Sequence, residues 1–429
     1  MSHVNRAIRS KPMPQPHTIY LSAYLLLTLA ILWTLSSPSF VLLAQAQSFT
    51  PSVVSGAAFA RTVNKLYVLG GTWSSGPDVK ISQFMYLDLS VVFSSTAPAW
   101  NKLTSGPAQN VFPVAFSSDE QTLYVFRVDN TNSPWRYFVK NDTWMELSTV
   151  TFQDASIEGI SAVTDPKTGL IYLAGGYRKD SLDAPAMKYM EIFDPITETL
   201  HTVDLPPPEK VFAIRWYAGN VWSRYRNSIL YWGGNNRIQT SPPSPVENAV
   251  TELSTDSMTW YSFLTQGPAP PVKADHCIAA NEDGTKVAIY GGRQRNNTAC
   301  GELWVLDVVT HTWTQGLSGP SRMYAVCTIA GDQFLIWGGR TSPTDMATSE
   351  MLIYNLTSAA YVKQYAPPSF YRNLQPPPPI SRTKAPWDTT GSGPTKDGLP
   401  VSIGAIAGGV IGALALMGRS KILYSNNKS

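Results

Sequence analysis

The side chains best suited to metal binding or redox chemistry in this sequence are five histidines and three cysteines. They stand at His3, His17, His201, His276, His311, Cys277, Cys300 and Cys327. Metal sites need ligands of matched type that cluster in space. Only His276 adjoins a cysteine, in a stretch that we expect to be an inner strand. We therefore expect no metal and no cofactor, and we interpret His276 as a structural residue.

Two further classes of chemistry lack their sequence signals. No glycine-rich loop follows a strand and opens a helix, which is the arrangement that binds phosphate. The net charge of +3 is too small to indicate a nucleic-acid partner. The sequence predicts a protein that is not an enzyme.

Pairs of glycines that follow short apolar runs show how the chain is organised. They stand at Gly70-Gly71, Gly175-Gly176, Gly233-Gly234, Gly291-Gly292 and Gly338-Gly339, at intervals of 105, 58, 58 and 47 residues. The first interval is about twice the others, and "TLYVFRVDN" (122–130) supplies the missing run without its glycines. Six units of about 50 residues therefore occupy 53–364, which is the period of propeller blades.

Each unit contains four predicted strands, and the fifth shows them most clearly. "HCIAAN", "KVAIYGG", "ELWVLDV" and "HTWTQG" follow one another there, with an Asp283-Gly284 turn after the first. Other third strands are expected at 83–89, 134–139, 188–194 and 249–255. Fourth strands carry Trp100, Trp144, Leu200, Trp260, Trp313 and Tyr361. The sequence predicts an all-β, six-bladed propeller whose last blade is contiguous, so that ring closure depends on packing between blades 6 and 1.

The repeat resembles the kelch-repeat family, and more closely its fungal membrane-anchored members with galactose oxidase central-domain-like or attractin/muskelin-like propellers. The resemblance covers about 48–368 and is carried by the glycine pairs, the residue before each pair and the later tryptophan. Blade 2, with Arg127-Val128, departs from it. The resemblance implies the fold and says little about function. It also raises a carbohydrate oxidase, whose copper site needs two histidines, two tyrosines and a crosslinked cysteine. A single inner histidine does not supply that site.

Residues 1–46 are predicted to be a signal peptide. Arg6, Arg9 and Lys11 precede the apolar "YLSAYLLLTLAILWTL", and the small residues Ala44 and Ala46 suit a cleavage site. An uncleaved anchor over 20–42 is the alternative.

The C-terminal part is predicted to be a Pro/Ser/Thr-rich stalk (369–398), a transmembrane helix (399–417) and a short cytoplasmic tail (418–429). A GPI signal is the alternative for the apolar segment. Gly404, Gly408 and Gly412 are four residues apart and therefore lie on one face of this helix. That face could pack against a second copy in a homodimer. The alternative is that small residues are simply common in such segments. These segments predict a single-pass type I protein of the plasma membrane or secretory pathway, with the propeller outside or in the lumen.

The loops between second and third strands are long, and we expect them to form the binding surface. They carry Trp73, Tyr177, Arg178, Arg237, Arg293, Arg295 and Arg340. Such side chains often anchor interfaces. The alternative is that the arginines pair with Asp78, Asp180, Asp183 and Asp345.

Glycosylation is predicted at Asn141, Asn296 and Asn355, the first and last in turns between third and fourth strands. Those turns lie on the face opposite the long loops. The predicted function is recognition of a protein or a cell-wall glycan through the long-loop face, with an oxidase-like enzyme or a kelch adaptor as alternatives. The pairing of the three cysteines stays open.

Overall fold

The computed structural model describes residues 49–73, 79–126, 133–152, 157–178, 189–205, 217–234, 249–294, 296–373 and 376–381. The chain divides into two units, Met1–Ser48 and Phe49–Ser429, and every described residue belongs to the second. The predicted signal peptide, the transmembrane segment with Gly404, Gly408 and Gly412, and the tail lie outside the described residues. Over the ranges given above, no helix is both long enough and apolar enough to cross a bilayer.

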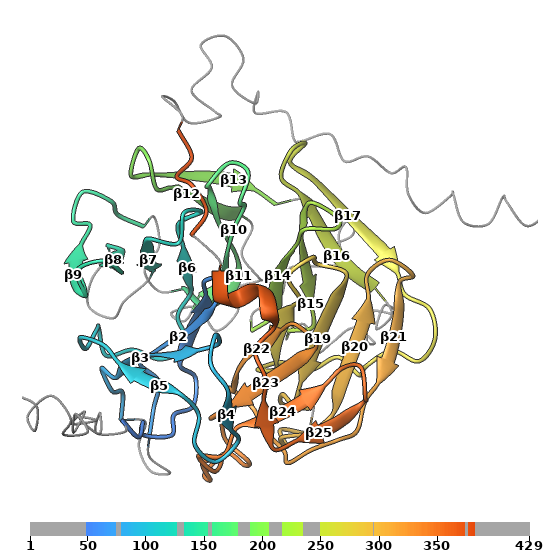
Figure 1. The fold of residues 1–429 in the computed structure, drawn as a ribbon. Helices are drawn as coiled ribbons and strands as arrows, with labels where there is room; N and C mark the ends of the chain where they lie inside the picture. The colour runs from blue at the N-terminus through green and yellow to red at the C-terminus, as the bar shows by residue number, and fades with distance from the viewer. Residues whose placement is uncertain are drawn as a thin grey trace, which may run out of the picture. The chain divides into compact units, whose positions relative to one another are not determined.

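The described residues form six four-stranded antiparallel sheets, or blades (Figure 1). Blades 1 to 3 contain β1 (Ala58–Arg61), β2 (Lys65–Leu69), β3 (Phe84–Asp88) and β5 (Trp100–Lys102); β6 (Val114–Phe116), β7 (Thr122–Val125), β8 (Trp135–Phe138) and β9 (Thr143–Glu146); β10 (Ile157–Thr164), β11 (Ile171–Arg178), β12 (Tyr189–Asp194) and β13 (Thr199–Asp204). Blades 4 to 6 contain β14 (Gly219–Ser223), β15 (Ser228–Trp232), β16 (Ala249–Ser254) and β17 (Thr259–Leu264); β18 (Cys277–Ala280), β19 (Lys286–Tyr290), β20 (Leu303–Asp307) and β21 (Thr312–Gln315); β22 (Val326–Ala330), β23 (Gln333–Trp337), β24 (Leu352–Asn355) and β25 (Ala360–Val362).

The first strands of the blades close a ring. Each packs against the first strand of the next blade, from β1 through β6, β10, β14, β18 and β22 back to β1. The predicted six-bladed, all-β propeller is therefore confirmed. The expected third strands match β3, β8, β12 and β16 to within one residue at each end. The predicted fourth-strand residues all lie in the fourth strands, including Leu200 in β13.

The second strands are apolar because both their faces are covered. Every residue of β15 ("SILYW") and of β23 ("QFLIW") is buried, since neighbouring blades pack on either side. The glycine pairs end these strands in the left-handed region, with φ of 67° at Gly338 and 65° at Gly291. A Cβ on Gly338 would lie 2.6 Å from the carbonyl oxygen of Val54. The pairs thus allow both the turn and the close approach of another backbone.

Ring closure uses an element that the sequence did not predict. Blade 6 is contiguous, as expected, but β26 (Gln364–Tyr365) follows it and pairs with β4 (Phe93–Ser94) of blade 1. The ring of Tyr365 stacks on Phe93 at 4.6 Å, and its hydroxyl donates to the carbonyl oxygen of Leu89 at 2.7 Å. Closure therefore combines blade packing with a two-stranded sheet.

The packed chain continues past Pro368, where the propeller was expected to end and an extended stalk to begin. A 3₁₀ helix, η1 (Ser369–Asn373), follows, and Tyr371 within it is 1% exposed. Tyr371 belongs to the same apolar cluster as Val326 and Trp337 of blade 6. A composition rich in Pro and Ser does not reveal that one aromatic residue anchors the segment.

A disulfide joins Cys277 and Cys327, the pair at equivalent places in β18 and β22. Their Cα atoms are 5.9 Å apart, within the range that a disulfide spans. Cys300 is buried and has no disulfide. The structure thus decides a pairing that the sequence left open.

Candidate ligand-binding mouth on the long-loop face

Residues in the left-handed region surround the ring axis on the face of the long loops. They are Gly56, Val111, Gly159, Tyr217, Asp275 and Tyr324, with φ between 51° and 71°. Their backbones are linked from blade to blade, since the Val111 amide donates to the Gly56 carbonyl at 2.7 Å and the Tyr324 amide to the Asp275 carbonyl at 2.8 Å. Side chains larger than glycine are strained in this region, and such strain is often found at functional sites.

Three tyrosines from these connections and loops lie in a row, each 6.3 Å from the next. The rings of Tyr217 in blade 4 and Tyr324 in blade 6 have centroids 6.3 Å apart, although these blades are not neighbours. Tyr177, at the end of β11, lies 6.3 Å from Tyr217, and its hydroxyl donates to Glu158 Oε2 at 3.1 Å. The three rings are partly exposed. Together they offer rigid, amphipathic contact area.

An ion pair lies beside the tyrosines. Arg293 Nε donates to Asp275 Oδ2 at 2.6 Å, and the Asp275 side chain is fully buried whereas that of Arg293 is 29% exposed. Burial raises the pKa of the Asp275 carboxyl to about 6 and outweighs the opposing attraction of Arg293. Burial also raises the pKa of the Tyr217 and Tyr324 hydroxyls, so both remain neutral hydrogen-bonding groups. We refer to Glu158, Tyr177, Tyr217, Asp275, Arg293 and Tyr324 as the mouth cluster.

The residues predicted for ligand binding have different places. Tyr177 and Arg293 belong to the mouth cluster. Arg340 Nη2 donates to Thr72 Oγ1 at 3.1 Å, which links blade 6 to the loop of blade 1 where Trp73 is 54% exposed. Arg178 ends β11, where its backbone pairs with Ile157. Arg237 and Arg295 lie outside the described residues, as do Asp78, Asp180 and Asp183.

Sequence reasoning missed four members of the mouth cluster, namely Glu158, Tyr217, Asp275 and Tyr324. Arg293 pairs with Asp275, which is not one of the four aspartates proposed for the arginines. A signal was present, because Tyr217, Asp275 and Tyr324 each stand two residues before a first strand. Those connections lie on the same face as the long loops, but the prediction from the sequence considered only the loops.

His276 occupies a packed position between blades 4 and 5. Its ring lies edge-on to Trp232 at 5.0 Å, and a Cβ on Gly233 would lie 2.6 Å from its Cε1 atom. Burial and the nearby Lys273 lower the pKa of His276 to about 3, so its ring is neutral. Among the described residues, no group of three or more His, Cys, Asp or Glu side chains could together hold a metal.

The predicted glycosylation sites differ in their surroundings. Asn141 is exposed in the turn between β8 and β9, as predicted, and Asn296 is exposed in a long loop. Asn355 ends β24 and is half-buried, and its Nδ2 donates to Asp332 Oδ2 at 2.7 Å. The amide that a glycan would modify is thus engaged at Asn355.

Residues 219–380, which contain blades 4 to 6, match the KLHDC2/KLHL20/DRC7 Kelch-repeats domain. The described fold is a kelch β-propeller. Similar sequences include the dynein regulatory complex subunit 7 of Chlamydomonas reinhardtii, 23% identical over 28% of this chain and 10% of that protein. Acyl-CoA-binding domain-containing protein 4 of Arabidopsis thaliana is 23% identical over 52% of this chain and 33% of that protein. Human host cell factor 1 is 26% identical over 28% of this chain and 7% of that protein.

A solved structure agrees with the fold. The structure titled "Structure of YjhT" superposes with a TM-score of 0.55 over 73% of this chain and 98% of that chain, at 16% identity. This likeness concerns the fold alone. The matched segments span 10% and 33% of the first two curated relatives, so this chain covers only a part of their length.

Proposed function

We propose that this kelch propeller is a binding module that takes a protein partner into the mouth on its long-loop face. The observation that carries the proposal is the convergence of Tyr177, Tyr217 and Tyr324 with the Asp275–Arg293 pair, from blades 3 to 6, onto one partly exposed surface. Tyrosine and arginine are frequent anchors of protein interfaces. Loops held by a rigid ring are also where binding residues concentrate.

We further propose that the propeller is extracellular or lumenal, anchored by the segment 399–417, as in fungal membrane-anchored kelch proteins. The predicted signal peptide supports this orientation. The Cys277–Cys327 disulfide supports it independently, because disulfides persist mainly in oxidising compartments. The spacing of Gly404, Gly408 and Gly412 supports a homodimer through that segment.

Other ligands and roles remain as outcomes of the test. A cell-wall glycan would use the same tyrosines, and an intracellular adaptor would use the same face without a membrane anchor. A carbohydrate oxidase is disfavoured, because His276, which stands directly before the inner strand β18, is neutral and packed against Trp232. Binding rather than catalysis therefore fits the mouth best.

Site-specific photo-crosslinking tests the proposal in the native host. A photoreactive residue at Trp73, beside the mouth, should crosslink a defined protein, whereas the same residue at Asn141 on the opposite face should not. The double change Arg293→Ala with Arg340→Ala should abolish the crosslink from position 73 while the Cys277–Cys327 disulfide still forms. A crosslink only from position 141, or one that survives the double change, would exclude the mouth. A glycan array with the same purified protein distinguishes the glycan ligand.

A further inference from the structure

The face opposite the long loops carries a charged site where three blades meet. We call it the turn face, because the first-to-second and third-to-fourth turns lie on it. Arg61, at the end of β1, pairs with Glu282 in the first turn of blade 5 at 2.6 Å. Glu282 also accepts from the Gly331 amide of blade 6 at 3.1 Å, and Arg61 Nη1 donates to the Ile329 carbonyl oxygen. Arg61 and Glu282 therefore hold blades 1, 5 and 6 together.

Tyr371 completes this site. Arg61 Nη2 donates to the Tyr371 hydroxyl, which in turn donates to Glu282 Oε1. Tyr371 is 310 residues from Arg61 in sequence and only 1% exposed. Burial raises the pKa of its hydroxyl, so it is a neutral donor at any ordinary pH. Hydrogen bonds to charged groups are about twice as strong as neutral ones.

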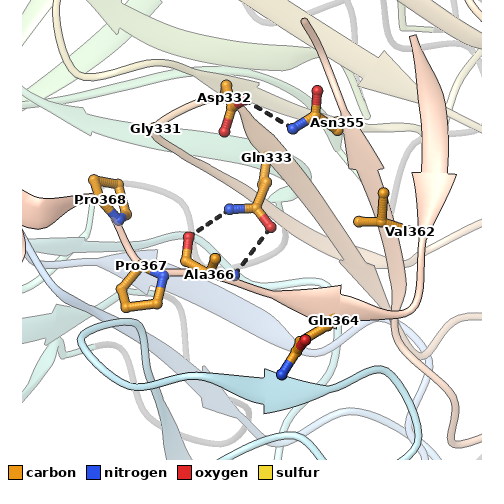
Figure 2. Close-up of a pocket in the computed structure, with 9 residues that line it drawn as sticks. All are labelled: Gly331, Asp332, Gln333, Asn355, Val362, Gln364, Ala366, Pro367 and Pro368. Carbon is orange, nitrogen blue, oxygen red and sulfur yellow. Dashed lines mark hydrogen bonds between the residues drawn. The ribbon is translucent and has the colours of Figure 1, made fainter. Parts of the chain in front are cut away.

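The residues before Tyr371 are held by polar and apolar contacts to blade 6 (Figure 2). Gln333, in β23, binds the backbone of Ala366 twice, because its Nε2 donates to the carbonyl oxygen at 2.6 Å and its Oε1 accepts from the amide at 3.2 Å. Pro368 covers Gly331, where an added Cβ would lie 2.6 Å from Pro368 Cγ. Figure 2 shows Ala366, Pro367 and Pro368 along one side of a hollow that Gln333 also lines.

The chain then remains on the turn face. A Cβ on Gly169, in the first turn of blade 3, would lie 3.3 Å from Ile380 Cδ1. In Figure 1, η1 lies over the middle of the ring between blades 1 and 6. The contacts of Ala366, Tyr371 and Ile380 thus run from blade 6 across to blade 3.

We propose that the turn face contains a docking site for the C-terminal segment of this chain, residues 364–373, with Tyr371 as the residue that locks it. The site binds a peptide that contains a tyrosine, and in the native protein this peptide is part of the same chain. Docking adds to the disulfide, the hydrogen bonds and the packing that already join blade 6 to blades 5 and 1.

Limited proteolysis of the full-length protein tests this site, because trypsin can cleave after Arg372 only when the segment leaves its site. Tyr371→Phe removes the hydroxyl but keeps the ring, and it should speed that cleavage about tenfold, since the rate follows the population of the open segment. Tyr371→Ala should speed it further and lower the melting temperature by several degrees. Ser369→Ala is the matched control, because Ser369 is exposed on the same helix, and it should change the rate less than about twofold.

Two results would overturn the proposal. One is an unchanged rate of cleavage after Arg372 in both Tyr371 variants, which would show that the segment is held elsewhere. The other is equal acceleration by Ser369→Ala, which would show that any change in the helix loosens it. Should Tyr371→Ala fail to fold, Tyr371→Phe and Glu282→Gln still give the test, because the first removes the hydroxyl and the second removes the negative charge that pairs with Arg61, and both should accelerate cleavage.

Discussion

Replacing Asp275 with asparagine should remove a pH dependence that the structure builds into the mouth. Burial raises the pKa of this carboxyl from its usual value of 3.8 to about 6. Folding therefore favours its protonated form. The stability from this group is fully present below about pH 4 and is lost as the pH rises through about 6. The change in proton affinity corresponds to about 3 kcal/mol, of which about 2 kcal/mol falls between pH 4 and pH 7.

The assay is urea unfolding of wild-type protein and Asp275→Asn at several pH values between about 4 and 7. All other groups titrate alike in both proteins, so the difference in unfolding free energy isolates Asp275. The ion pair to Arg293 exists only when Asp275 is ionised, so its effect is already contained in the pKa of about 6. Asparagine does not titrate, and it differs from the protonated carboxyl by a constant offset. Against that offset, the free energy of unfolding of the variant minus that of the wild type should rise by about 2 kcal/mol from pH 4 to pH 7.

A flat or falling difference would refute the reasoning. It would mean that attraction to Arg293 outweighs burial and that the carboxyl stays ionised throughout the range. Asp283→Asn is the matched control, because Asp283 is exposed in a turn of the same blade. That variant should show no rise over the same range.

Two further predictions concern stability. The double change Cys277→Ser with Cys327→Ser should lower the unfolding free energy by about 4 kcal/mol, since the disulfide closes a loop with a sequence separation of 50. Thiol titration of the denatured, unreduced wild type should detect Cys300 alone. Three reactive thiols would contradict the pairing. Gly291→Ala should cost at least about 2 kcal/mol, because its Cβ would overlap the carbonyl oxygen of Arg322. Gly267→Ala, with φ of 76° but only ordinary van der Waals contacts for its Cβ, should cost only about 1 kcal/mol, and equal losses in urea unfolding would show that the overlap is relieved.

The strands and their order could be predicted because their causes are local. Apolar runs such as "VAIYGG" and "FLIWGG" show both a strand buried on two faces and the glycines that end it. The same order repeats in each unit, so even blade 2, without its glycines, is found by spacing. Tyr177 and Arg293 were predicted as candidate site residues for a similar reason, because long loops between second and third strands can be recognised from the sequence alone.

The partners of those residues were not predictable, because ring closure brings together segments that are distant in sequence. Arg293 could be given a charge partner from the sequence, but only the packed ring shows that it is the buried Asp275. The contact between Tyr217 and Tyr324 exists because blades 4 and 6 stand on either side of blade 5, and both connections turn toward the ring axis there.

The sequence by itself determined the repeat, the strand pattern and the face on which the long loops lie, since these follow from hydrophobic periodicity and backbone chirality. Only the tertiary structure decided the Cys277–Cys327 pairing, the β4–β26 sheet and the burial of Tyr371 against Arg61 and Glu282. Each of these depends on how a closed ring orients its blades. Residues 310 positions apart then meet, although no local signal in either segment specifies the other.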